Sequence, residues 1–229
     1  MLNSGNLENY DCFVVDDDHH LKLAKRLHAD TYLRRGFVAK EHIDEQGHIS
    51  KKADPHQDHS VYFVVIKNHI QDPSVVLTAR QIRDHSKLGM KSFPLLEQAH
   101  IYSRYREIIQ RHKPSEITEI SGLAKASGEP TAATLILYRF MGHYSLAKGD
   151  KLWLMACAPA LYERLKNFFG PSVVQIGERT EYVGEDIIPA MVDIERAVKW
   201  LEKATTKLHP VHRPLSRFVL DQPEIKTTK

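Results

Sequence analysis

One carboxylate lies inside a stretch of sequence that otherwise predicts a buried strand. The stretch TEISGLAK, residues 118–125, places Glu119 beside the apolar residues Ile120, Leu123 and Ala124. A buried carboxylate without a partner is strongly unfavourable, or it takes up a proton and becomes neutral. Glu119 therefore either faces solvent or belongs to a site that uses it.

A buried arginine is predicted by the stretch VVLTARQI, residues 75–82, which contains Arg80. An unpaired buried guanidinium is unfavourable, so we expect this side chain to have an acidic partner. Either Asp54 or Asp58, in the polar stretch before it, could pair with Arg80 and anchor that stretch. Alternatively, Arg80 could hold the carboxylate of a ligand. Asp58 could likewise orient an amine, or cap the turn that enters the next strand.

Two other charged stretches have less specific patterns. Residues 16–20, DDDHH, contain metal-ligand types, but their spacing closes no site, and three aspartates suit a helix N-terminus, so we expect no metal. The densest basic stretch is SRYREIIQRHK, which contains Arg104, Arg106, Arg111, His112 and Lys113. It could dock an acidic partner by electrostatic steering, or it could be a solvated helix face.

Composition excludes several classes of protein. The hydrophobic fraction of 42% and charged fraction of 27% are typical of a globular domain, and the net charge of +3 is too weak to argue for nucleic acid. No apolar run approaches the roughly 20 residues of a transmembrane helix, and the N-terminal residues lack the pattern of a signal peptide. Cys12 and Cys157 lie in apolar stretches, which favours free thiols in a reducing cytoplasm.

Hydrophobic periodicity and turn residues predict an alternation of strands and helices. Strands are expected at residues 10–15, 61–67, 75–82, 117–124, 151–158, 173–178 and 188–194. Helices are expected from the aspartates at 16–18 to about 34, and at 103–112, 131–146, 160–168 and 195–208. This order predicts an α/β protein with one mixed sheet and helices on both faces.

Three connecting segments complete the predicted organisation. Residues 36–59 are polar and predict a long, functional or mobile loop. Residues 70–74, IQDPS, predict the turn of a hairpin. Residues 209–229 contain three prolines and several basic residues, so we expect an extended tail after a single domain that spans residues 1–208.

Several of these stretches, in this order, resemble one family. The order of elements is similar to the GNAT acyltransferase fold, with its mostly antiparallel sheet. The motifs resemble the branch that contains acyl-homoserine-lactone synthases, long-chain N-acyl amino acid synthases and exosortase-associated acyltransferases. They are RLHADTYLRRGF, DPHQDHSVYFVV, VVLTARQI, FPLLEQ, EITEISGLA and ERTEYVGEDIIPAMVDI.

The resemblance implies attack of an amine on a thioester carbonyl. Glu119 is then the candidate base, with a pKa raised by partial burial, and Tyr162 in APALYERL is the candidate proton donor to the leaving sulfur. The alternatives to these catalytic roles are that Glu119 faces solvent or forms a salt bridge, and that Tyr162 only packs in the core. The resemblance also implies that certain residues lie along the donor channel or the acyl pocket, where the alternative is ordinary core packing: Thr118, Ser121, Gly122, Phe63, Phe93, Leu95, Trp153 and Met155.

The sequence departs from the family pattern at three places. His28 and Gly122 stand where the branch usually has arginines. The phosphate-binding turn, residues 125–130 with Lys125, Ser127 and Gly128, contains a proline that removes one N–H donor and Glu129, which adds negative charge. A donor with a single phosphodiester, such as the phosphopantetheine of an acyl carrier protein, would demand less of this turn than coenzyme A.

The function predicted from these features is an N-acyltransferase. It would move a fatty acyl group from an acyl carrier protein, or from coenzyme A, to a small amine such as an amino acid, with no tightly bound cofactor. The basic stretch at residues 104–113 would then dock the acidic carrier protein. Two alternatives stay open: a coenzyme A-dependent GNAT N-acetyltransferase, and a degenerate GNAT fold that serves as a binding module.

Overall fold

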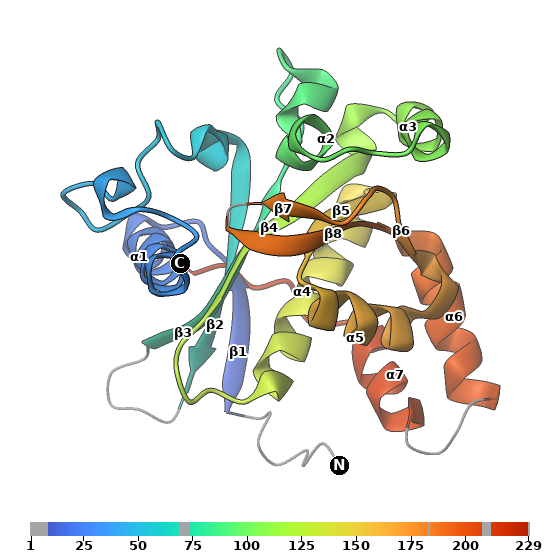
Figure 1. Cartoon of the computed structure of the whole chain (residues 1–229). Coiled ribbons are helices and arrows are strands. Elements are labelled where there is room, and N and C mark those ends of the chain that lie inside the picture. Colours follow the sequence, from blue (N-terminus) through green and yellow to red (C-terminus); the bar gives the residue numbers. More distant parts are fainter. Residues whose placement is uncertain (1–8, 69–73, 183, 208–211, 229) are drawn as a thin grey trace. The chain divides into compact units, whose positions relative to one another are not determined.

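The computed structural model describes residues 9–68, 74–182, 184–207 and 212–228. Their strands are β1 (Tyr10–Val14), β2 (Ser60–Lys67), β3 (Ser74–Ile82), β4 (Ile117–Lys125), β5 (Leu152–Cys157), β6 (Val173–Gln175), β7 (Thr180–Tyr182) and β8 (Glu185–Asp193). Their α-helices are α1 (Asp18–Arg35), α2 (Pro94–Gln98), α3 (Ser103–Gln110), α4 (Thr131–Lys148), α5 (Pro159–Phe169), α6 (Ile194–Lys207) and α7 (His212–Leu220) (Figure 1). Short 3₁₀ helices are η2 (Lys40–His42), η3 (Pro55–His59), η4 (Gly89–Ser92), η5 (Pro114–Glu116) and η6 (Gly170–Ser172).

The strands follow the order β1-β2-β3-β4-β5-β8-β6, with β7 also paired to β8. The pairs of β1 with β2 and of β8 with β5, β6 and β7 are antiparallel, and β4 pairs with β5 in parallel. This confirms the predicted α/β class with a mixed, mostly antiparallel sheet.

Two compact units divide the chain. Unit 1 comprises Met1–Gln81, Gly122–Tyr144 and Gln222–Lys229, and unit 2 comprises Ile82–Ser121 and Ser145–Asp221. The predicted boundary between a domain of residues 1–208 and a tail stays a prediction.

Helix α1 of unit 1 begins and ends at strong local signals. The Asp17 side chain caps its first turn by accepting a hydrogen bond from the His20 amide at 2.9 Å. Gly36 ends it in the left-handed conformation, with φ of 75°, and its N–H donates to carbonyl oxygens of the last turn. Ala24 and His28 are among the residues on its buried face.

The polar stretch of residues 36–59 is a structured connection rather than an open loop. It contains η2 and η3, and Ile43 forms an antiparallel bridge with Ile49. Between them, the Asp44 carboxylate accepts hydrogen bonds from the amides of Gln46 and His48, both at 2.9 Å. These local bonds order residues 43–49, ahead of η3.

The core of unit 2 joins its strands to two short helices. Its fully buried members come from the segment around α2, from β4, from β5 and from β6 onward: Phe93, Leu95, Ile117, Leu154 and Ile176 are all 0% exposed. Strands β5 and β8 supply alternate apolar side chains to this cluster, as a buried antiparallel pair requires. This core fixes the first half of β4.

The local structure differs from the predictions at α7 and at β7. Residues 212–220 form α7, so the predicted tail is not extended throughout; Pro214 lies in the first turn, where proline removes no intrahelical hydrogen bond. Strand β7 was missed because three mainly polar residues carry no alternating pattern. The predicted hairpin turn at 70–74 lies almost entirely outside the described residues.

Candidate functional site

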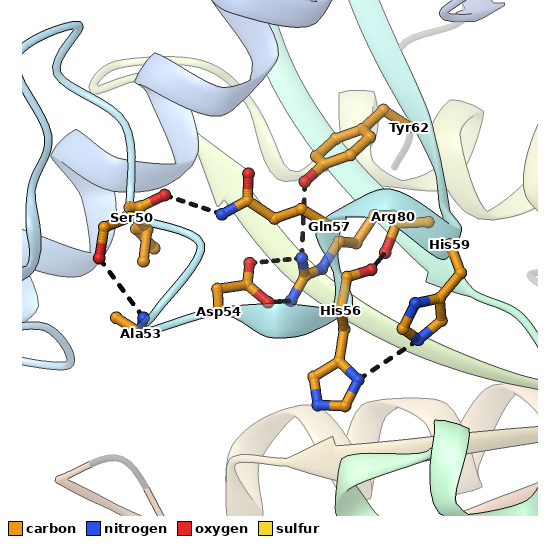
Figure 2. A network of polar contacts seen from close by, with 10 residues as sticks. Ser50, Ala53, Asp54, His56, Gln57, His59, Tyr62 and Arg80 are labelled. Carbon is orange, nitrogen blue, oxygen red and sulfur yellow. Dashed lines mark hydrogen bonds and ion pairs between the residues drawn. The ribbon is translucent and has the colours of Figure 1, made fainter. Parts of the chain in front are cut away.

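Arg80 of β3 forms a buried ion pair with Asp54 inside unit 1 (Figure 2). Its Nη1 and Nη2 atoms donate to the two oxygens of Asp54 at 2.5 and 3.0 Å, and Nη1 lies 3.5 Å from the Tyr62 hydroxyl. Burial lowers the pKa of Arg80, but the Asp54 carboxylate and the hydrogen bonds outweigh it and leave this pKa above its ordinary value. Arg80 is therefore a permanent cation whose two terminal nitrogen atoms, Nη1 and Nη2, are already bonded to Asp54.

The structure decides between the two predicted partners of Arg80. Asp58 is exposed and pairs instead with Lys51, 2.8 Å away. Asp54 reaches Arg80 because it directly precedes η3, and η3 is tied down by two bonds. The Gln57 side chain donates to the Ile49 carbonyl at 2.8 Å, and the Ser60 hydroxyl donates to the His56 carbonyl at 2.7 Å.

His28 lies beside this pair, although sequence reasoning noted it only as a departure from a family pattern. Burial, and then the positive charge of Arg80, lower the pKa of His28 to about 3, so its imidazole is neutral. Its ring contacts Gly122 of β4: a Cβ atom there would lie 3.2 Å from the His28 ring and 3.4 Å from Cγ of Arg80. Gly122 has φ of 64°, which also favours glycine.

Glu119 is buried in unit 2, at 2% exposure, so the predicted solvent-facing alternative is wrong. Its Oε2 accepts a hydrogen bond from the backbone N–H of Leu95 at 3.0 Å. Leu95 is the second residue of α2, whose first N–H groups have no partner within the helix. The carboxylate thus caps a short helix, and its role as a base stays a prediction.

A second buried carboxylate, Asp150, which sequence reasoning missed, precedes β5 and contacts the side chain of Thr118 in β4. Asp150 is buried and pairs with the Arg83 guanidinium, which donates to it from Nη1 at 3.1 Å and from Nη2. The Thr118 hydroxyl donates to the same carboxylate at 3.0 Å. Thr118 therefore anchors β4 through its side chain, and the only signal in the sequence is an aspartate after a glycine at the end of a helix.

The parallel register of β4 with β5 ends close to these residues. It runs from Ile117 opposite Leu152 to Ile120 opposite Met155, and Ser121 follows it. Beyond that point β5 continues only in its pairing with β8. The pairing with β5 therefore covers only the first four residues of β4.

Several residues predicted for a channel or a leaving-group site are tightly packed. Phe93 is 0% exposed in the core of unit 2, and Tyr162 of α5 is 5% exposed. Trp153 is buried and donates from its indole N–H to the Ser145 hydroxyl at 2.8 Å. Their predicted roles stay predictions.

The turn between β4 and α4 holds more positive charge than the sequence suggested. The Glu129 carboxylate accepts a hydrogen bond from the Tyr10 hydroxyl at 2.6 Å and pairs with Lys67 at 3.1 Å. Arg34 donates to the Ser127 hydroxyl at 3.0 Å, and Lys125 donates to the Glu129 carbonyl. The negative charge of Glu129 is therefore offset, so it does not by itself oppose an anion here.

A cavity of about 220 Å³ lies beside the predicted basic stretch in unit 2. Its lining is Met90, Lys91, Leu96, Glu97, Arg106, Ile109 and Gln110. Arg106 of α3 is held there by bonds to the carbonyls of Ile101 and Leu96, each at 3.4 Å. Arg104 instead stacks on the Tyr105 ring, 4.6 Å from its centroid. The four cations predicted for docking, Arg104, Arg106, Arg111 and Lys113, are all exposed, but Arg106 and Arg104 differ in their contacts.

Within the ranges that the structure describes, no three His, Cys, Asp or Glu side chains gather as a metal site. His20, in the DDDHH stretch, is bonded to Asp17 of the helix cap at 2.8 Å. No described helix is both long and apolar enough to span a membrane.

Comparison with solved structures identifies the fold. FeeM, an N-acyl amino acid synthase from uncultured soil microbes, matches with a TM-score of 0.61 and 13% identity, over 83% of this chain and 93% of that one. The acyl-homoserine lactone synthase LasI matches with a TM-score of 0.56 and 14% identity, over 81% and 90% of the two chains. The CoA-dependent acyl-homoserine lactone synthase BjaI, solved with SAM and isopentyl-CoA, matches with a TM-score of 0.62 and 15% identity, over 95% of this chain and 93% of that one.

The chain has the GNAT-like fold of these acyltransferases. No protein-family model and no curated protein sequence matches it. At 13–15% identity, the likeness establishes the architecture that the motif order predicted, while the chemistry rests on the chain's own residues.

Proposed function

We propose that this protein is an N-acyltransferase that moves an acyl group from a thioester to the amine of a small acceptor. The observation that carries the proposal is a buried carboxylate, Glu119, on the strand β4, whose parallel register with β5 ends one residue later, at Ile120. In a fold used by acyl-transferring synthases, backbone groups left free where two strands part can pair with the amides of a pantetheine arm. Glu119 would take the proton of the attacking ammonium, directly or through water.

The donor is an acyl carrier protein or coenzyme A, and different observations favour each. For coenzyme A, the β4–α4 turn has Arg34 and Lys125 at hand, with Glu129 already paired to Lys67. For a carrier protein, basic residues along and after α3 offer positive charge to an acidic surface: Arg104, Arg106, Arg111 and Lys113. A cytoplasmic location, which the free buried thiols of Cys12 and Cys157 suit, would supply both donors.

The direct test is an assay of acyl transfer. Purified protein is incubated with fatty acyl carrier protein, acetyl-CoA and long-chain acyl-CoA in turn, together with a mixture of amino acids, and N-acyl products are identified by mass spectrometry. We expect N-acylated product with at least one long-chain donor. Product from acetyl-CoA alone would support the alternative acetyltransferase. No transfer from any donor, with no thioester retained by the protein, would instead favour a binding module.

The role of Glu119 is tested by Glu119→Gln. The amide oxygen of glutamine can still accept the Leu95 N–H bond, so this contact is kept while the base is lost. We expect kcat to fall by roughly 10²–10⁴-fold, the usual contribution of a general base. Glu181→Gln, at an exposed position of β7, is the matched control and should leave turnover unchanged. Full turnover by Glu119→Gln across the pH range would refute the base assignment.

A further inference from the structure

Nε2 of His28 and Nε of Arg80 are buried atoms of unit 1 that have no hydrogen-bond partner among the described residues. Both side chains belong to residues that are only 5% exposed. Buried polar atoms are almost always paired, and leaving two neighbouring ones unpaired is unfavourable. Neither atom is used by the Arg80–Asp54 ion pair described above, since that pair uses Nη1 and Nη2.

The two side chains meet at one backbone position. A Cβ atom on Gly122 would lie 3.2 Å from Cε1 of His28 and 3.4 Å from Cγ of Arg80. Cε1 is bonded directly to the unpaired Nε2 atom, and Cγ is two bonds from the unpaired Nε atom. The absence of a side chain at Gly122 therefore lets the imidazole and the arginine stem approach the same position of β4.

The charges at this position are already balanced. Arg80 is neutralised by its two-pronged contact with Asp54, and His28 carries no charge, because burial and the Arg80 cation hold its pKa at about 3. A ligand carboxylate would therefore be desolvated without gaining a free cation, which is unfavourable. The unused groups are one obligate donor, the Arg80 Nε–H, and one neutral imidazole nitrogen, which can donate or accept.

We propose that Nε2 of His28 and Nε of Arg80 form a subsite for an uncharged oxygen of the acyl acceptor, a hydroxyl or an amide carbonyl, and not for a carboxylate. A hydroxyl accepts from Arg80 and donates to, or accepts from, the imidazole; an amide oxygen accepts from both. The identity of the ligand as the acyl acceptor rests on the proposed acyl transfer, whereas the hydrogen bonding at these two nitrogen atoms does not. His28 is then a residue that determines specificity.

Direct binding without any acyl donor tests the subsite. Protein labelled with ¹⁵N-histidine is titrated with three matched pairs: asparagine and aspartate, glutamine and glutamate, and homoserine and 2-aminobutyrate. The His28 side-chain resonance is assigned from its loss in His28→Gln. We expect the uncharged-oxygen member of at least one pair to shift this resonance and to bind about tenfold or more tightly than its partner. The amide and hydroxyl pairs show which source of oxygen the subsite takes.

Three substitutions separate hydrogen bonding from packing. In His28→Gln the amide group reaches the place of Nε2, whereas in His28→Asn it reaches only that of Nδ1, and His28→Phe keeps the ring without nitrogen. We expect discrimination within the pairs, measured by calorimetry, to survive in the Gln variant and to be lost in the Asn and Phe variants. His48→Gln, at another buried histidine of unit 1, is the control and should behave as wild type.

The outcomes are distinguishable from failure of the proposed function. Equal binding within every pair, tighter binding of aspartate and glutamate, or a His28 resonance that none of the six compounds shifts would each overturn the subsite. Selective binding by a protein that acylates no amine would leave the subsite standing and overturn the transferase alone. Melting temperatures of all variants show whether a loss of binding reflects unfolding.

Discussion

The Arg80–Asp54 pair allows a stability prediction whose size follows from its burial. The two side chains are 6% and 10% exposed, and their charges are in direct contact. Asp54→Ala removes one partner and leaves a desolvated guanidinium, which costs about 3–5 kcal/mol of unfolding free energy. For a chain of this size each kcal/mol corresponds to about 2–4 °C, so we expect the melting temperature to fall by about 6–20 °C.

A double-mutant cycle shows whether the loss comes from the unpaired charge. Arg80→Met alone should also destabilise strongly, because it strands the Asp54 carboxylate. The double variant removes both charges and should be more stable than either single variant, with a coupling of about 3 kcal/mol or more. Thermal and urea unfolding followed by circular dichroism measure all four proteins. Additive losses would refute this reasoning, since they would show that the charges do not depend on each other.

The exposed pair next to it is the matched control. Asp58 lies in the same short helix that follows Asp54, and its contact with Lys51 is 2.8 Å long. Both side chains are about two-thirds or more exposed, at 67% and 71%. Exposed ion pairs are screened by water and salt, so Asp58→Ala should leave the melting temperature unchanged.

Two further predictions concern the stability of the protein at low pH and the reactivity of its two thiols. Burial alone would raise the pKa of Asp17, but hydrogen bonds from Thr228 and from His20 lower it. The ionised Asp17 carboxylate therefore stabilises the fold above about pH 4, and this contribution is lost as the pH falls below that value. Asp17→Ala should lower the unfolding free energy by about 1 kcal/mol at pH 7, measured by urea unfolding, and by progressively less at low pH. Burial raises the pKa of Cys157 to about 12 and that of Cys12 well above its usual value, so neither thiol should react with Ellman's reagent before unfolding.

Most of the elements could be predicted because their signals are local. The strand over Glu119, the long helix after Pro130 and the strand after it all have continuous apolar runs with clear boundaries, and the structure places each within two residues of its predicted ends. Helix α7 was missed because its proline suggested a break, whereas a proline in the first turn leaves the helix intact.

Site contacts were predicted only where charge chemistry restricts the choice. A buried Arg80 must have an acidic partner, which reduced the candidates to Asp54 and Asp58. The choice between them depends on where η3 begins, and no local pattern encodes that position. The partner of Glu119 was harder still: it is a backbone N–H 24 residues earlier, and any residue except proline at position 95 would supply one.

The two polar side chains at the start of β4 explain why a carboxylate could be kept in this core. Successive side chains of a strand point to opposite faces, so Thr118 and Glu119 each need a partner on their own side of the sheet. Thr118 has Asp150, and Glu119 has the amide of Leu95. If β4 shifted its register by one residue, Thr118 and Glu119 would both lose their hydrogen-bond partners. The bonds that hold Glu119 therefore also fix the register of β4. Replacing Glu119 by alanine would therefore lose an anchor as well as a base, while glutamine loses only the base; a difference in stability between these two variants, with equal loss of turnover, is what this reasoning requires.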